Sequence, residues 1–373
     1  MHILHITTFL QGGAGQIITA LALAQRDAGH EVTVVTDDGG APGYASYPEY
    51  LQRLSRAGVR VFPVRSTFTR DLALNVGAAA QLRALVDAHP VTVCHTHAAI
   101  PALVAHLALA GCRRVPFIHT MHGWGITKTP QQAATDLTLL GTADVVVTPS
   151  AAARRALMEQ GLGDVPLNVI PYGIDAELPS RAADTEDVVA IDSLRSHLVA
   201  LCIGTIGERK NQALLIKALA SNPLAAAVFI GDGDVSGLRA EAEQAGVAHR
   251  VRILGYRPDA SRYLAHADVL VLPSRNEGLP IAVLEAFRAG VPAVASDIPE
   301  IAEAVEDGAT GVLFAPDDAG ALAAALDRVG NPLQRARMGE TARRTFASHY
   351  GTERMLVEYE RLYTGLITQR LAA

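Results

Sequence analysis

The feature that most constrains the fold is a repeated alternation of short apolar runs with longer Ala- and Leu-rich stretches of helical periodicity. The apolar runs are continuous rather than alternating, which is typical of strands buried on both faces of a parallel sheet. The strands expected in the first half are residues 2–6, 31–35, 59–64, 91–95, 117–120 and 144–148. Those expected in the second half are residues 198–204, 228–230, 251–254, 269–272 and 293–295. The pattern predicts the doubly wound α/β class, formed twice.

The chain therefore divides into two Rossmann-like domains that we expect to face each other across a cleft. At 373 residues it is too long for a single compact core. We expect residues 1–174 to form the first domain and 175–351 the second, with the polar stretch 175–197 as the linker between them. Residues 352–373 have an amphipathic helical pattern and are expected to form a closing helix.

Composition limits the compartment and the partners. The net charge of −6 and the even mixture of signs exclude a basic field for nucleic acid. Three widely spaced cysteines predict neither a disulfide framework nor a zinc site. The N-terminus has no positively charged region or cleavage site, and the most apolar stretch, 98–112, is too short to span a bilayer. We expect a cytoplasmic protein whose contact with membranes is at most peripheral.

The strongest local motif is the segment PSRNEGLPIAVLEA at 273–286. A strand ends just before it, a polar turn carries Glu277 and Gly278, and Pro280 stands where a helix would begin. The free N–H groups of a helix start form a site for anions, so a diphosphate could dock on the amides near Gly278 and Leu279. Glu285 lies more than one turn into the helix. The alternative interpretation is a plain helix entry with solvated glutamates.

Glu277 and Glu285, spaced by seven residues, resemble the motif of the retaining glycosyltransferases of family 4 (glycosyl transferases group 1), which have the GT-B fold. The resemblance extends over nearly the whole chain, and it implies that the helix expected at 352–373 crosses back and packs on the first domain. It includes LQGGA at 10–14, which resembles the family's N-terminal glycine loop and which we expect to be a loop before a helix. Further matches are GHEV at 29–32, VIPYGID at 169–175, IGDG at 230–233, LGYR at 254–257 and DGATG at 307–311, in the family's order.

The resemblance implies roles for residues of the second domain, where the nucleotide-sugar would bind. Glu277 would contact hydroxyls of the donor sugar, and Glu285 would contact the ribose hydroxyls of the nucleotide. Arg209 and Lys210 would neutralise the diphosphate, with an exposed turn as the alternative. The family usually has Arg where this chain has Thr205, so either Arg209 supplies the missing charge or donor binding is altered.

Further donor residues implied by the resemblance are Arg257 and, in the first domain, Gly13, whose backbone could approach the phosphate or the acceptor. His122 matches the family's Thr-x-His and would lie at the cleft near the donor sugar, so Glu277 and His122 are the expected catalytic residues.

The first domain would bind the acceptor, and its candidate residues are less specific. They are His97, Trp124, Lys128 and Tyr44, and for His97 and Trp124 a purely structural role is equally open. His95/His97 and His119/His122 lack a carboxylate at metal-ligand spacing, so no metal site is expected.

The sequence thus predicts a metal-independent, retaining hexosyltransferase that uses a nucleotide-diphosphate sugar, with UDP favoured and no cofactor. Residues 1–172 contain 12 Lys and Arg against 11 Asp and Glu, a balance of +1, which favours a soluble small-molecule or saccharide acceptor over anionic lipid. A lipid-linked glycan or a cell-envelope polysaccharide stays open as acceptor. Two other classes also remain: a non-catalytic nucleotide-sugar-binding subunit, and an NAD(P)-dependent oxidoreductase, which the incomplete glycine fingerprint disfavours.

Overall fold

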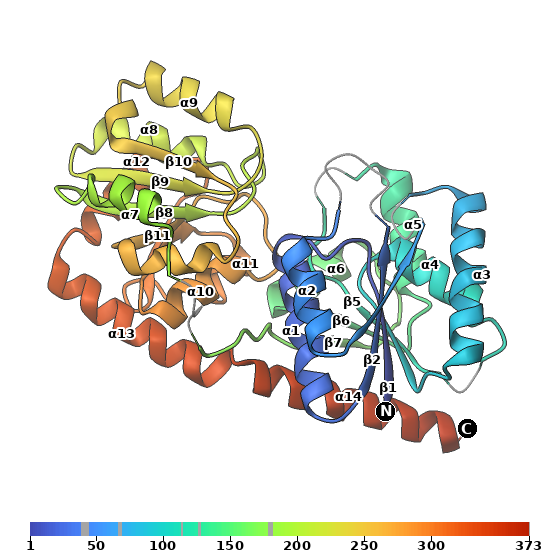
Figure 1. Ribbon diagram of the computed structural model, residues 1–373. Helices are drawn as coiled ribbons and strands as arrows, with labels where there is room; N and C mark the ends of the chain where they lie inside the picture. Colours follow the sequence, from blue (N-terminus) through green and yellow to red (C-terminus); the bar gives the residue numbers. More distant parts are fainter. Residues whose placement is uncertain (39–44, 66–68, 113–114, 126–127, 178–181, 373) are drawn as a thin grey trace. The chain divides into compact units, whose positions relative to one another are not determined.

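The computed structural model describes residues 1–38, 45–65, 69–112, 115–125, 128–177 and 182–372. The chain forms two compact units, one of residues 1–173 with 352–373 and the other of residues 174–351. Each unit is a parallel sheet covered by helices on both faces (Figure 1). Both sheets were expected from the sequence, and the α/β class is confirmed. Within the described part of the chain, no helix has both the length and the apolar character needed to cross a bilayer.

Unit 1 contains a seven-stranded sheet in the order β3-β2-β1-β4-β5-β6-β7. Its strands are β1 (His2–Ile6), β2 (Glu31–Asp37), β3 (Arg60–Val64), β4 (Val93–Thr96), β5 (Phe117–Thr120), β6 (Val145–Thr148) and β7 (Leu167–Val169). Its helices are α1 (Gly12–Asp27), α2 (Pro48–Arg56), α3 (Leu72–Ala88), α4 (Ala99–Ala108), α5 (Pro130–Leu140), α6 (Ala151–Glu159) and α14 (Thr352–Ala372).

The C-terminal helix α14 belongs to unit 1, where it packs beside α1. Its apolar stripe places Met355, Tyr359 and Tyr363 inside, each at most 2% exposed. Three positions spaced by four residues lie on one face of a helix, as the amphipathic pattern predicted. The packing of this helix on the first unit is what the family resemblance implied.

Unit 2 contains a six-stranded sheet in the order β10-β9-β8-β11-β12-β13. Its strands are β8 (Leu198–Ile203), β9 (Ala225–Ile230), β10 (Val251–Gly255), β11 (Val269–Leu272), β12 (Ala293–Ser296) and β13 (Gly311–Phe314). Its helices are α7 (Thr185–Asp192), α8 (Ala213–Ser221), α9 (Val235–Gln244), η1 (Ala248–Arg250), η2 (Ala260–His266), α10 (Ile281–Ala289), α11 (Pro299–Ala302), α12 (Ala319–Arg328) and α13 (Pro332–His349).

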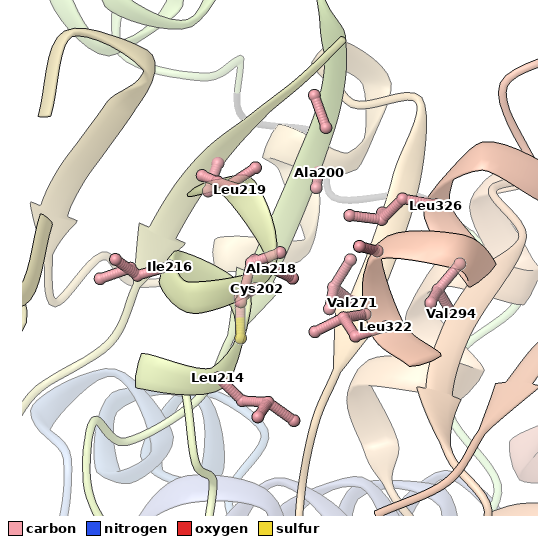
Figure 2. Close-up of a cluster of buried hydrophobic side chains, with 14 of the residues drawn as sticks. Ala200, Cys202, Leu214, Ile216, Ala218, Leu219, Val271, Val294, Leu322 and Leu326 are labelled. Carbon is pink, nitrogen blue, oxygen red and sulfur yellow. The ribbon is translucent and has the colours of Figure 1, made fainter. Parts of the chain in front are cut away.

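One face of the unit 2 sheet packs against α8 and α12 through a buried cluster that includes Leu214, Leu219, Val271, Leu322 and Leu326 (Figure 2). Cys202 lies in the same cluster, and burial raises the pKa of its thiol to about 12, so it stays protonated. The free thiols of Cys94 and Cys202 are therefore core residues and not reactive groups.

The structure differs from the sequence expectations at three places. The glycine segment is not a loop, because α1 begins at Gly12, whose φ of +54° suits glycine. The expected linker 175–197 includes a helix, α7, which contacts η2 and β10 within unit 2. Strand β7 was not expected, because it has three residues, none of them buried, and so carries no apolar run. Strand β13 was not expected either.

Candidate active site

The centre of the candidate site in unit 2 is an ion pair between Lys210 and Glu277. Lys210 Nζ lies 2.6 Å from Glu277 Oε1, and Arg209 Nη1 lies 3.5 Å from Glu277 Oε2. Arg209 also donates to the main-chain oxygen of Asn276 at 3.1 Å. The two cations follow β8 and the carboxylate follows β11, which are adjacent parallel strands. Since the carboxyl ends of parallel strands meet at one edge of a sheet, residues 67 and 68 positions apart come together.

Glu277 is ionised although only 8% of it is exposed. Burial alone would raise the pKa of its carboxyl group, but the nearby charges of Lys210 and Arg209 outweigh this effect and lower the pKa. Arg209 keeps 46% of its side chain exposed, so it is available to a ligand as well as to Glu277. The site therefore holds one buried carboxylate with two cations, of which one reaches solvent.

The loop that carries these cations is fixed by close backbone packing. Gly204 has a φ of +143°, and a Cβ on Gly231 would lie 1.9 Å from the main-chain oxygen of Gly204. Gln212 closes the loop, because its amide donates to the oxygen of Thr205 at 3.0 Å and accepts from the N–H of Gly207 at 3.1 Å. Thr205 itself is exposed.

Helix α10 begins beside this group, as its proline predicted. Pro280 is the N-cap, and no side-chain hydrogen bond caps the helix within the described residues. Val283 and Leu284 both donate to the main-chain oxygen of Pro280, at 3.0 and 3.4 Å, so the amides of Ile281 and Ala282 are those that precede the helix's own hydrogen bonds. Gly278 and Leu279 are buried in the turn before it, and Glu285 lies buried in its second turn at 8% exposure. Because Glu277 and Glu285 are both buried, the alternative of a helix entry with solvated glutamates does not describe this segment.

Arg257 does not join this group in the described contacts. Its guanidinium forms a bidentate pair with Asp187 on α7, with N–O distances of 2.6 and 2.9 Å, and Tyr263 donates to the same carboxylate at 2.6 Å. The Arg257 hydrogen bonds lower the pKa of the Asp187 carboxyl group. The structure thus shows a role for Arg257 in holding α7 to β10, and its donor-binding role stays a prediction. Sequence reasoning missed Asp187 because it treated this segment as linker.

His122, at the end of β5 in unit 1, has both ring nitrogens engaged. Nδ1 lies 2.7 Å from Tyr172 Oη, and Nε2 lies 3.1 Å from His97 Nδ1. Although His122 is only half-buried, desolvation lowers its pKa to about 4, so the ring is neutral at pH 7. A neutral imidazole with both nitrogens occupied is poorly suited to proton transfer. Tyr172, which lies in the sequence motif at 169–175, was not singled out from the sequence.

His97 is buried, and its other ring nitrogen lies 3.0 Å from His5 Nδ1, which favours the structural interpretation of this residue over acceptor binding. The nitrogens of His5, His95 and His97 lie close enough together to be considered as metal ligands. However, each ring nitrogen of these three histidines already lies 2.7 to 3.1 Å from a hydrogen-bonding partner. A metal ion would have to replace several of these hydrogen bonds.

Of the other acceptor candidates, Trp124 and Lys128 form a local unit. Lys128 Nζ lies 3.6 Å from the centroid of the Trp124 ring and 2.8 Å from Asp136 Oδ2. Trp124 packs against the buried cluster of Met121, Leu140 and Val146, as a loop anchor would. Gly13 is exposed in the first turn of α1, and Tyr44 lies outside the described residues.

Comparison with known proteins decides the family. Residues 190–345 match the model of Glycosyl transferases group 1, and residues 11–178 match that of Glycosyltransferase Family 4. A GDP-mannose-dependent alpha-(1-6)-phosphatidylinositol monomannoside mannosyltransferase of Mycolicibacterium smegmatis is 30% identical over 360 residues, covering 91% of this chain and 89% of the relative. The chain is a group 1 glycosyltransferase.

Other relatives of this glycosyltransferase are more distant but equally extensive. N-acetyl-alpha-D-glucosaminyl L-malate synthase of Bacillus anthracis is 24% identical over 94% of this chain and 93% of the relative. The Anabaena protein Alr3699/HepE, crystallised with UDP and glucose, has the same fold with a TM-score of 0.83, at 20% identity over 98% of this chain and all of that chain. The GT-B fold and the family resemblance are confirmed, and the oxidoreductase alternative is excluded.

Proposed function

We propose that this glycosyltransferase moves a hexose-type sugar from a nucleotide-diphosphate donor to an acceptor hydroxyl group with retention of the anomeric configuration. The observation that carries the proposal is the group formed by Lys210, Arg209 and Glu277 beside the uncapped start of α10. Cations and helix amides stabilise a diphosphate, and a buried carboxylate accepts hydrogen bonds from sugar hydroxyls.

In the proposed reaction the bond between the anomeric carbon and the phosphate oxygen breaks, and the acceptor oxygen bonds to the same face of that carbon. The proton of the acceptor hydroxyl passes to the departing phosphate oxygen. The negative charge that develops on the diphosphate is stabilised by Lys210 and Arg209 together with the amides at Gly278 and Leu279. Positioning and electrostatics account for this chemistry, so we propose that no metal ion is required.

The pair between Lys210 and Glu277 also positions the lysine for the donor. The buried carboxylate holds the lysine at 2.6 Å. A diphosphate would give the lysine a second anionic partner, while donor hydroxyls would satisfy Glu277. In this proposal Glu285 binds the ribose from the second turn of α10.

We propose UDP as the nucleotide and a soluble saccharide or small molecule as acceptor. UDP is supported by the UDP and UDP-glucose complexes of the structural neighbour HepE. The names of two relatives favour a second candidate, a lipid-linked acceptor, because one acts on phosphatidylinositol monomannoside and another on a GlcNAc-diphosphoundecaprenol. The near-neutral charge of residues 1–172 favours the soluble acceptor.

A thermal-shift screen with UDP-, GDP-, ADP- and TDP-sugars tests the donor, because a bound ligand raises the melting temperature by mass action. We expect UDP-sugars to give the largest shift, and the Glu285→Ala variant to lose most of it. Proton NMR of the product of the stabilising donor then reports the anomeric configuration, which we expect to be that of the donor. Stabilisation without hydrolysis or transfer for any acceptor would favour a non-catalytic nucleotide-sugar-binding subunit.

A further inference from the structure

Two loops of unit 2 meet at the candidate site through residues in the left-handed backbone conformation. In the part of the chain that the structure describes, the non-glycine residues with a positive φ are Asn211, Asp259 and Asp317, at +54°, +51° and +60°. This conformation is unfavourable for residues with a side chain, although asparagine and aspartate tolerate it best. Asn211 Nδ2 donates to Asp317 Oδ1 at 3.0 Å, so two of the three are bonded to each other. Backbone strain of this kind is typical of functional sites.

Asn211 ends the loop that carries the two cations, residues 205–211, which we call the cation loop. It directly follows Lys210, and the N–H groups of Lys210 and Asn211 donate to the main-chain oxygen of Gly207 at 3.1 and 2.9 Å. The main-chain oxygen of Asn211 then accepts from Leu214 in the first turn of α8. The backbone of Asn211 therefore sets how the cation loop joins α8, and with it the position of Lys210.

Asp317 also reaches the other end of the cation loop, through Arg275. Asp317 lies between β13 and α12, whereas Arg275 follows β11. Arg275 Nε donates at 2.7 Å to Asp317 Oδ1, the same oxygen that binds Asn211. Arg275 Nη1 donates to the main-chain oxygen of Glu208 at 3.3 Å, and its main-chain N–H donates to that of Arg209 at 2.9 Å. One carboxylate oxygen thus connects the cation loop to the loops that follow two other strands.

These contacts of Asp317 matter for position more than for their energy as an ion pair. The side chains of Arg275 and Asp317 are 38% and 53% exposed, and an exposed ion pair contributes little to the free energy of unfolding. A hydrogen bond from a cation to a phosphate, by contrast, needs a donor–acceptor distance of about 2.8 Å. A small displacement of the cation loop is therefore enough to weaken it.

We propose that Asp317 is a positioning residue that holds the cation loop, so that Arg209 and Lys210 meet the diphosphate of the donor. Asp317 acts through Asn211 and Arg275, which bind the two ends of the loop. The proposal rests on the proposed function in one respect, the binding of a diphosphate by these two cations.

Two aspartates in the same backbone conformation provide a matched pair of variants. Asp317→Gly removes the carboxylate, and glycine adopts a positive φ readily, so the backbone at this position can stay as it is. Asp259→Gly makes the same replacement in the same unit. The described interactions of Asp259 are with the main-chain N–H of Arg262 and with the charge of Arg288, neither of which lies in the cation loop. Asp317→Asn is the conservative variant, because asparagine tolerates the conformation and keeps one oxygen for both donors.

The protection of the loop amides tests the proposal without a ligand. Hydrogen exchange of the full-length protein reports the N–H groups of Lys210 and Asn211, which the oxygen of Gly207 protects. We expect these amides to exchange about tenfold faster in Asp317→Gly and at the wild-type rate in Asp259→Gly. Equal exchange in the wild type and Asp317→Gly would overturn the inference.

Calorimetric titration with UDP and with uridine separates positioning from general structural damage. UDP carries the diphosphate that the cation loop would bind, whereas uridine carries only the ribose and the base. We expect Asp317→Gly to weaken UDP binding about tenfold, the effect of one weakened hydrogen bond to a charged group, and to leave uridine binding unchanged. Asp259→Gly should keep the wild-type affinity for both ligands, and Asp317→Asn should recover most of the affinity for UDP.

Equal weakening of UDP and uridine binding in Asp317→Gly would show general damage to unit 2 and would overturn the positioning role. Unchanged UDP binding would overturn it too, and so would tighter binding, because Asp317 would then only withhold Arg275 from the diphosphate. A wild type that binds none of UDP, GDP, ADP and TDP would refute the proposed function instead. The exchange of the Lys210 and Asn211 amides would still decide whether Asp317 holds the loop.

Discussion

Lowering the pH from 7 to 5 should destabilise unit 1 through its buried histidines. Burial lowers the pKa of His5 to about 4 and that of His119 to about 3, from an ordinary value of 6.5. The unfolded chain therefore binds protons below pH 6.5 that the folded chain does not bind. The contribution of these neutral histidines to the free energy of unfolding is complete above pH 6.5. It is lost as the pH falls from 6.5 toward 4.

The size of the loss follows from the width of that window. One pKa unit corresponds to about 1.4 kcal/mol, and pH 5 lies 1.5 units below the ordinary value of 6.5, so each such histidine costs about 2 kcal/mol. His5 and His119 together therefore remove about 4 kcal/mol, and His95 and His97, lowered by the same cause, add to it. This is a large part of the free energy of unfolding of a typical domain, which is about 5 to 15 kcal/mol.

The assay is urea unfolding at pH 7 and pH 5, followed by circular dichroism and by the fluorescence of Trp124, which lies in unit 1. His119→Gln removes one of the titrating groups, so we expect its loss of unfolding free energy between the two pH values to be smaller by about 2 kcal/mol. The matched control is His89→Gln, because His89 is exposed in the same unit and should leave the loss unchanged. Equal unfolding midpoints of the wild type at pH 7 and pH 5 would refute the reasoning.

Three further predictions concern unit 2. Gly231→Ala should raise KM for the donor at least tenfold, because its Cβ would lie 1.9 Å from the oxygen of Gly204 and displace the loop that carries Lys210; an unchanged KM would contradict this. Arg257→Met should lower the free energy of unfolding in urea by about 2 kcal/mol, because the buried Asp187 carboxylate would keep the Tyr263 hydroxyl but lose its cation; unchanged stability with a raised donor KM would instead support the donor-binding role. Transfer activity should persist in excess EDTA, whereas a loss that manganese restores would contradict metal-independent chemistry.

The sequence predicted the fold and the candidate site best where residue type and strand order point to the same place in the sheet. Continuous apolar runs identified the parallel sheets, and Pro280 located the start of α10 to within one residue. Glu277 was selected from its motif after a predicted strand, and Lys210 from the family resemblance. Parallel strands bring the two residues to one edge of the sheet.

The contacts that depend on side-chain packing could not be predicted from the sequence. His5 and Gln25 lie on different elements, and nothing in their spacing indicates that His97 joins them to His122. The pair of Arg257 with Asp187 could not be predicted for a related reason, since α7 has eight residues, of which only two are buried. Its helical state depends on packing against η2 and β10 rather than on periodicity.

The most direct test of the central claim is the turnover of donor by the Lys210→Ala variant beside a matched lysine control. Lys210 lies 2.6 Å from Glu277, whereas Lys217 is exposed on α8 and 3.5 Å from Glu241, so Lys217→Ala removes the same side chain away from the site. We predict that Lys210→Ala lowers kcat by about a hundredfold or more, the usual scale for removing one transition-state stabiliser, while Lys217→Ala keeps wild-type turnover. Near-normal turnover in Lys210→Ala would show that the reaction takes place elsewhere.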